Sequence, residues 1–98
     1  MREAPRRVPY DWDPGKAISN FNEHGVSFEE AITVFGDPLA LTILDPDHSI
    51  SEERWLTTGL SAQGRIVAVW HTNRGDSGRL IGARPATPQE RRNYESGE

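Results

Sequence analysis

Four short segments rich in β-branched and aromatic residues follow one another along the chain from residue 39 onward. They are residues 39–44, 54–58, 65–72 and 79–84. This composition is typical of β-strands, and the Gly, Asn, Asp, Pro and Ser residues between them are typical of turns. A parallel crossover needs about a dozen residues or more, so connections this short join only antiparallel neighbours. The spacing therefore predicts a small antiparallel sheet.

Two helices are predicted directly before this sheet, because start and stop signals flank both of them. The first has Asp13 in the N-cap position and Gly25 at its end, where a left-handed turn is needed. The second begins with Ser27 and Glu30, which form a capping-box pattern, and it stops before Pro38. The connection between them is tight, which predicts a helical corner packed on the sheet.

The first helix is predicted to have two distinct faces. Its apolar stripe comprises Ala17, Ile18 and Phe21. A polar row spaced four residues apart comprises Lys16, Asn20 and His24. That row either offers a cation and a titratable imidazole to a phosphate or is a solvated helix face, and the spacing alone favours the solvated face.

The whole pattern predicts one α+β domain over residues 10–95, with a flexible basic arm at 1–9 and a short tail at 96–98. Residues 8–12 are predicted as a short edge strand, and a capping box opens a C-terminal helix over about 87–94. The expected order is (β)ααββββα, a small antiparallel sheet with two N-terminal helices and one C-terminal helix, packed mainly on one face.

Charge is divided unevenly along the chain, although the net charge is only -4. Residues 11–53 hold ten acidic residues and one lysine, whereas residues 54–92 hold seven arginines and two acidic residues. The planar arginine fork is well suited to phosphate. Charge alone leaves two interpretations equally open: a basic surface for nucleic acid, or acidic helices that pair with a basic sheet.

Several classes of site are excluded by the residues themselves. The chain has no cysteine, so disulfides and thiolate metal sites are excluded. It has no Gly-rich phosphate loop, no HExxH motif and no G-x-S-x-G elbow. The longest apolar run, residues 66–70, is too short to cross a membrane, and the N-terminus lacks the apolar core of a signal peptide. We expect a cytoplasmic protein without a metal or other cofactor.

Arginines on the predicted strands are the best candidates for phosphate binding. Arg65, Arg79 and Arg84 could line a shallow basic surface, although ordinary solvation at strand ends explains Arg65 and Arg84 about as well. His71 is more typical of a hydrogen-bonded structural histidine than of a catalyst. Trp70, like Trp55, is expected in the core or an interface rather than as a platform for stacking bases.

Five separated blocks of the sequence closely resemble the BrnT family of toxins from bacterial type II toxin–antitoxin pairs. The blocks are WDPGKAISNFNEHGVSFEEAITVFGDP, SEERW, GRIVAV, RGDSGRLIGARPAT and ERRNYE. The resemblance covers about residues 10–95 and implies a RelE-like ribonuclease fold with metal-independent RNA cleavage. It also implies neutralisation by a BrnA-like antitoxin with a ribbon-helix-helix domain. The toxin–antitoxin complex would bind operator DNA only through this antitoxin, and it would repress its own operon.

The resemblance also implies roles for polar residues of the matched blocks. The catalytic candidates are His24, Glu53, Arg65, Arg79 and Arg84. The RNA-binding candidates are Lys16, Arg54, Arg74 and Tyr94. Cleavage would proceed by attack of an RNA 2′-OH on the adjacent phosphate, with a base, a cation and an acid required. The arginines are expected to stabilise phosphate charge, and either His24 or Glu53 is expected to transfer the proton.

One departure from the family pattern leaves a second function open. Gly82 stands where the family strand usually has serine. If that hydroxyl orients a neighbouring arginine, the chain would be a catalytically weak module that binds the antitoxin within an autorepressor complex. A non-enzymatic RNA-binding protein is a third interpretation, which predicts salt-sensitive binding without products.

Overall fold

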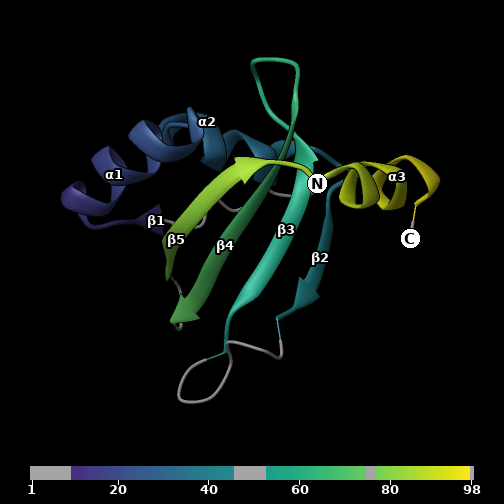
Figure 1. Cartoon of the computed structure of the whole chain (residues 1–98). Coiled ribbons are helices and arrows are strands. Elements are labelled where there is room, and N and C mark those ends of the chain that lie inside the picture. Colours follow the sequence, from purple (N-terminus) through teal and green to yellow (C-terminus); the bar gives the residue numbers. More distant parts are fainter. Residues whose placement is uncertain (1–9, 46–52, 75–76, 98) are drawn as a thin grey trace, which may run out of the picture.

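The computed structural model describes residues 10–45, 53–74 and 77–97. Its elements, shown in Figure 1, are β1 (Tyr10–Asp11), α1 (Pro14–His24), α2 (Phe28–Ile32), the 3₁₀ helix η1 (Thr33–Gly36), β2 (Leu41–Leu44), β3 (Trp55–Leu60), β4 (Ile66–Arg74), β5 (Ser77–Pro85) and α3 (Pro88–Ser96). The predicted α+β class and element order are therefore confirmed. The predicted arm at residues 1–9 and the residues of the β2–β3 connection at 46–52 lie outside the described residues.

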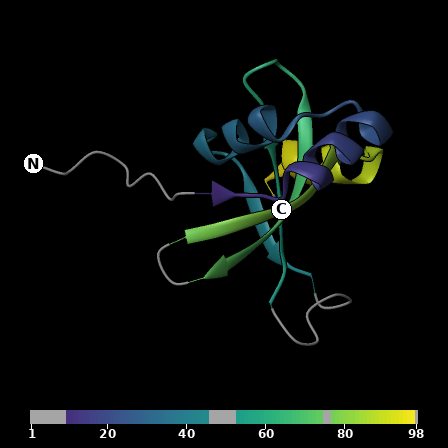
Figure 2. The same ribbon diagram turned by 90° about the vertical axis from the view of Figure 1, so that its left-hand side faces the viewer.

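The five strands form one sheet in the order β1-β5-β4-β3-β2. Strands β2 to β5 are antiparallel neighbours, as the short connections predicted. At the other edge, β1 pairs in parallel with β5, with Tyr10 opposite Gly78. Figure 2 turns this edge toward the viewer, with α1 beside it. A β-bulge interrupts the β4–β5 register between Trp70 and His71.

The helix ends follow the signals in the sequence. The Asp13 carboxylate accepts a hydrogen bond from the Lys16 backbone N–H at 2.9 Å, and Gly25 ends α1 with φ of 73°. Helix α3 has a complete capping box between Thr87 and Glu90. The second predicted helix is shorter than expected, because α2 gives way to a 3₁₀ turn at Thr33.

The hydrophobic core lies between one face of the sheet and the α2–η1 segment. Its fully buried residues are Val26, Phe28, Ala31, Val34, Val67, Val69, Leu80 and Ala83. We call the opposite side of the sheet the outer face, and it carries the alternate residues Leu56, Ala68, Trp70, Gly82 and Arg84. Helix α3 approaches the outer face near β3, with Glu90 and Asn93 close to Leu56. The third helix thus lies on the face that the other two leave open.

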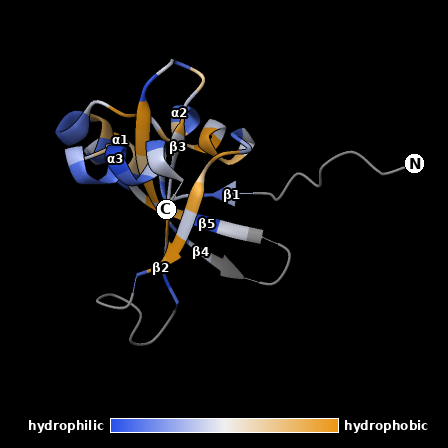
Figure 3. Cartoon of the chain, turned by 90° about the vertical axis from the view of Figure 1, so that its right-hand side faces the viewer, coloured by the Kyte–Doolittle hydropathy of each residue, from blue (hydrophilic) through white to orange (hydrophobic). Residues whose placement is uncertain are grey.

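Side-chain hydropathy differs between these elements. Figure 3 shows a predominantly hydrophilic α3 and apolar residues along β2. On β2, Ile43 is 56 % exposed, so this edge strand presents apolar surface. No helix within the described part of the chain is long and apolar enough to cross a membrane.

The prediction of an apolar, core-facing stripe on α1 is wrong for Ile18 and Phe21. Ile18 and Phe21 are 64 % and 54 % exposed, whereas Asn20 is buried. The carboxamide of Asn20 donates to the carbonyl oxygens of Val26 and Ala83 at 2.9 and 2.8 Å and accepts from the Ala83 N–H at 3.0 Å. Asn20 therefore pairs with the edge of β5 as a neighbouring strand would, which satisfies backbone groups that β1 is too short to reach.

Candidate nucleic-acid interface

Strand alternation brings two of the predicted arginines to the outer face. Val67 and Val69 of β4 point into the core, so the residues between and beyond them point outward. Arg84 lies opposite Ala68, and Arg79 lies opposite Thr72 in the register of β4 and β5. The outer face thus combines arginines from β5 with apolar positions from the central strands.

A groove with a volume of about 420 Å³ runs across this face. Its lining residues are Ile43, Leu44, Asp45, Arg54, Leu56, Trp70, Ile81 and Gly82. Most of this lining is aliphatic or aromatic, and Arg54 supplies the cation. Apolar walls with a few polar groups are typical of sites for small ligands or parts of larger ones, which commonly enclose about 300–1,000 Å³.

Trp70 lies half-buried in this groove and is held on two sides. Its indole N–H donates to the Asp45 carboxylate at 3.1 Å. The guanidinium of Arg84 lies over the indole, 4.7 Å from the ring centroid. Such a cation–π contact fixes the relative orientation of ring and cation. Trp70 therefore lies outside the core and on an open surface.

Arg84 also forms a two-pronged ion pair with Glu90 of α3. The two guanidinium nitrogens donate to the two carboxylate oxygens at 2.8 and 3.1 Å. Burial alone would raise the pKa of Glu90, but the hydrogen bonds from Arg84 and Thr87 outweigh it and lower that pKa. The pair ties α3 to β5 and keeps the Arg84 guanidinium in place over Trp70.

The remaining arginines of this region differ in their contacts. Arg79 donates to the Asp11 carboxylate at 3.3 Å in an exposed pair. The backbone carbonyl of Arg54 accepts from Asp45, which continues the β2–β3 ladder to the end of the groove. Glu53 is exposed and directly precedes Arg54. The side chain of Arg74, at the end of β4, lies outside the described residues.

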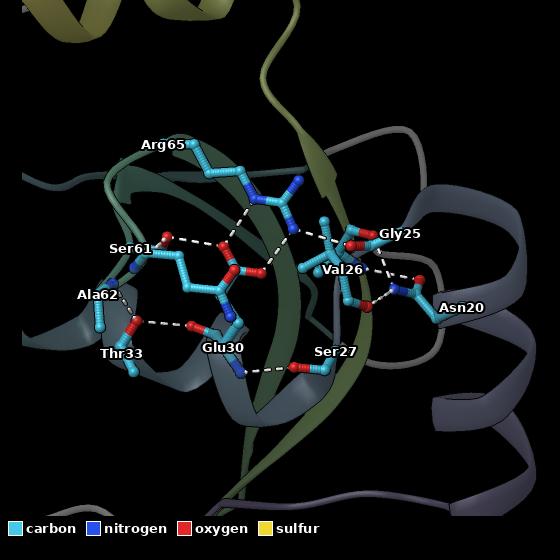
Figure 4. Close-up of polar contacts among 11 residues, drawn as sticks. Asn20, Gly25, Val26, Ser27, Glu30, Thr33, Ser61, Ala62 and Arg65 are labelled. Atoms are coloured by element: carbon cyan, nitrogen blue, oxygen red, sulfur yellow. Dashed lines mark hydrogen bonds and ion pairs between the residues drawn. The ribbon is translucent and has the colours of Figure 1, made fainter.

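Arg65 lies on the helix-covered side of the sheet and is bound to Glu30 (Figure 4). Its Nε and Nη2 donate to the two Glu30 oxygens at 2.8 and 2.6 Å, and Nη2 also donates to the Gly25 carbonyl at 2.8 Å. The Glu30 side chain is only 1 % exposed and also accepts from Ser61. The Arg65 hydrogen bond lowers the pKa of Glu30, so both groups are charged.

This ion pair gives Glu30 and Arg65 roles other than the capping and phosphate binding for which the sequence made them candidates. The predicted capping box at Ser27 forms only its first half, because the Glu30 carboxylate binds Arg65 and not the N-cap backbone. Arg65 joins the end of α1, the start of α2 and the β3–β4 turn. It holds the fold together at a distance from the outer-face groove.

The polar row predicted on α1 is divided between different environments. Asn20 is buried at the β5 edge, whereas Lys16 and His24 are exposed. His24 lies 3.8 Å from Glu23 and next to the Gly25 carbonyl that binds Arg65. The structure therefore places His24 at the helical corner, one residue before the Gly25 carbonyl that binds Arg65, and it does not bring Asn20 to the surface.

Tyr94, predicted to bind RNA, anchors α3. Its hydroxyl donates to the Asp37 carboxylate at 2.6 Å, and this hydrogen bond raises the pKa of Tyr94. The same carboxylate accepts from the backbone N–H groups of Leu39 and Leu60. Asp37 thus links α3 to the segment before β2 and to the end of β3, a role that has no signal in the sequence.

His71 is structural, as its sequence context favoured. Its ring is buried, with Nε2 and the Thr57 hydroxyl 2.8 Å apart, and Thr57 is in turn 2.8 Å from the Thr42 hydroxyl. The rings of Tyr10 and Phe35 contact the imidazole edge-on. Burial lowers the pKa of His71 from 6.5 to about 4, so the imidazole is neutral near pH 7.

Comparisons with known proteins agree with this architecture. The family model "Ribonuclease toxin, BrnT, of type II toxin-antitoxin system" matches residues 12–90. The crystal structure of the Brucella abortus ribonuclease toxin BrnT has the same fold, with a TM-score of 0.61 and 20 % sequence identity, over 83 % of this chain and 99 % of that one. No curated protein sequence is significantly similar to the chain. From the family match, this chain belongs to the BrnT family of ribonuclease toxins of type II toxin–antitoxin systems.

Proposed function

We propose that the protein is a metal-independent endoribonuclease toxin that cleaves RNA and so inhibits translation and growth. In this proposal the RNA lies across the outer face of the sheet. The observation that carries the proposal is an apolar groove that contains Trp70, with Arg54 in its lining and Arg84 over the indole ring, on the face where the strand register also puts Arg79. Arginine forks bind phosphate, and aromatic rings stack on bases, so the two together favour a single-stranded nucleic acid.

Cleavage by the RNA's own 2′-OH requires proton transfer and charge stabilisation. The 2′-oxygen attacks the adjacent phosphorus, the bond to the 5′-oxygen breaks, and a 2′,3′-cyclic phosphate and a 5′-hydroxyl form. Arg79 and Arg84 would stabilise the extra negative charge on the phosphate. Glu53, next to Arg54 at one end of the groove, is better placed to accept the 2′-OH proton than His24, which lies at the helical corner.

We propose that a BrnA-like ribbon-helix-helix protein neutralises the toxin and that operator DNA is bound only through this antitoxin. The cytoplasm, where both messenger RNA and operator are present, is the proposed location. The deciding observation would be a small ribbon-helix-helix protein encoded next to this chain.

The experiment that tests the proposed function measures growth and RNA in parallel. Induction of the protein alone in bacteria should arrest growth, and Arg79→Ala should relieve the arrest while the protein stays folded. Arg65→Ala serves as the comparison, because its contacts predict a loss of stability rather than of phosphate binding. Arrest that persists undiminished in Arg54→Ala, Arg79→Ala and Arg84→Ala alike would exclude the outer face.

A second function is favoured by the ion pairs on the same face. Arg79 and Arg84 each contact a carboxylate, Asp11 and Glu90, which offsets their charge. In this alternative the chain is a catalytically weak module that binds the antitoxin within a transcriptional autorepressor. Intact antitoxin binding by purified protein that degrades no RNA would favour the module.

A further inference from the structure

The outer-face groove has the lining and size of a site for one flat aromatic group. We propose that it binds a single unstacked base of single-stranded RNA against Trp70, and that this subsite anchors the RNA on the outer face. This inference deepens the proposed function, since it rests on RNA being the ligand. Trp70 is then a substrate-binding residue rather than part of a core or a protein interface.

The lining of the groove favours a base over a phosphate. Leu56 and Ile81 supply aliphatic surface beside Trp70, and Ile43 of the edge strand adds a side chain that is 56 % exposed. Gly82 contributes no side chain, which leaves space opposite Trp70 in the β4–β5 register. A planar, largely apolar ring fits such a surface, whereas a phosphate would lose hydration against the aliphatic side chains.

Two contacts hold Trp70 ready for stacking. Asp45 accepts the indole N–H, and Arg84 lies over the ring while Glu90 holds its guanidinium. Side chains fixed before binding lose little conformational entropy when the ligand arrives. The indole is therefore preorganised, which is the condition for a base-stacking platform of useful affinity.

Cations lie on both sides of the apolar surface. Arg54 lines one end of the groove together with Asp45, and the Arg84 guanidinium lies over the Trp70 ring, 4.7 Å from its centroid. An unstacked base within RNA is flanked by two phosphates, so this order of cation, apolar surface and cation matches a nucleotide and its neighbours. An apolar side chain from a protein partner could contact the same apolar lining, but it carries no phosphates and would form no ion pairs with the two arginines.

The experiment measures binding of an RNA that cannot be cleaved. The probe is a fluorescently labelled single-stranded 2′-O-methyl RNA octamer, compared with the same octamer carrying one abasic position, with fluorescence anisotropy as the readout. Each variant is first checked by circular dichroism. We expect Trp70→Leu to weaken binding of the intact octamer roughly 5- to 150-fold and Trp70→Phe to retain most of it.

Gly82→Val provides an independent test that leaves Trp70 in place. A Cβ at this position would meet only the Asn20 carboxamide oxygen, at an ordinary 3.6 Å, so the backbone accepts a side chain here. The two methyl groups of valine are expected to fill the groove, and circular dichroism checks that the variant folds. We expect a loss of octamer affinity comparable to that of Trp70→Leu. In the wild type, removing the base that occupies the groove should weaken octamer binding by a similar factor. The octamer without this base should therefore bind the wild type, Trp70→Leu and Gly82→Val with the same affinity.

A spectroscopic control separates stacking from a structural role. Octamer binding should quench tryptophan fluorescence in the wild type, and Trp70→Phe should abolish the quenching. Trp55→Phe is the matched control, because Trp55 lies opposite His71 on the other side of the sheet and should leave the quenching intact. Quenching that survives Trp70→Phe would overturn the proposal.

The outcomes distinguish this inference from the proposed function. Unchanged octamer affinity in both Trp70→Leu and Gly82→Val would overturn the base subsite, even if the wild type cleaves RNA. Loss of antitoxin binding with unchanged octamer affinity would identify the groove as a protein-docking site and would also overturn it. Base-dependent binding without any cleavage of unmodified RNA would support the subsite and refute the ribonuclease.

Discussion

Replacing Arg65 by methionine should destabilise the fold without removing a phosphate contact. Methionine keeps an unbranched, flexible side chain but removes the guanidinium. The variant loses three hydrogen bonds of 2.6–2.8 Å, two to Glu30 and one to the Gly25 carbonyl. It also leaves the Glu30 carboxylate, 1 % exposed, without its cation. Breaking a buried ion pair by removing one partner costs about 3–5 kcal/mol.

The expected magnitude is smaller than that range because the Arg65 side chain is 39 % exposed. Water can reach the vacated end of the pair and partly solvate Glu30. We therefore expect the free energy of unfolding to fall by about 2–3 kcal/mol, and the melting temperature of a chain this size to fall by roughly 10–20 °C. Urea and thermal unfolding followed by far-UV circular dichroism measure both quantities.

Two further variants make the reasoning refutable. Arg79→Met removes an exposed pair, with Asp11 71 % exposed, and should change stability by less than about 1 kcal/mol. Adding Glu30→Gln to Arg65→Met removes the unpaired carboxylate, so the double variant should be less destabilised than the sum of the single changes. An Arg65→Met protein as stable as the wild type would refute a structural role for this ion pair.

Three other predictions concern the core and the sheet edge. In the wild type, the native His71 imidazole resists protonation between pH 6.5 and about 4 while the unfolded chain accepts a proton, so stability should fall by up to about 3 kcal/mol as the pH falls through this window. His71→Gln should flatten this pH dependence, which urea midpoints measure. Asn20→Asp keeps the size of the side chain but places a carboxylate against two carbonyl oxygens, so the free energy of unfolding at pH 7 should fall by about 3 kcal/mol. Chemical unfolding should show part of this stability restored in acid, where the new carboxyl group is protonated. Gly78→Ala should lower the melting temperature, because a Cβ there would lie 2.5 Å from the Tyr10 ring, whereas Gly82→Ala should change it little.

Local signals predicted most of the architecture. Caps such as Asp13 and Gly25 act within a few residues of the backbone they bind, so the sequence alone places them. The short turns likewise determine which strands are neighbours. The parallel pairing of β1 with β5 had no such signal, because it joins residues nearly seventy positions apart and depends on the finished sheet.

Side chains that bind across the fold were not predictable in the same way. Glu30 has the spacing of a capping box, but its partner Arg65 lies 35 residues away and is brought near by the sheet register. Asn20 belongs to a polar row by spacing, yet it is buried because β5 has unpaired backbone groups beside α1. Alternation along β4 puts Trp70 on the side opposite Val67 and Val69, but only the packing of α2 and η1 shows which of these sides is the covered one.

RNA cleavage by the purified protein, with and without EDTA, tests the central claim most directly. The proposal predicts short products with 2′,3′-cyclic phosphate ends in either condition. It also predicts that Arg79→Ala, whose stability should match the wild type, abolishes most of the activity. A folded wild-type protein that leaves RNA intact, or cleaves it only when a divalent metal is present, would contradict the claim.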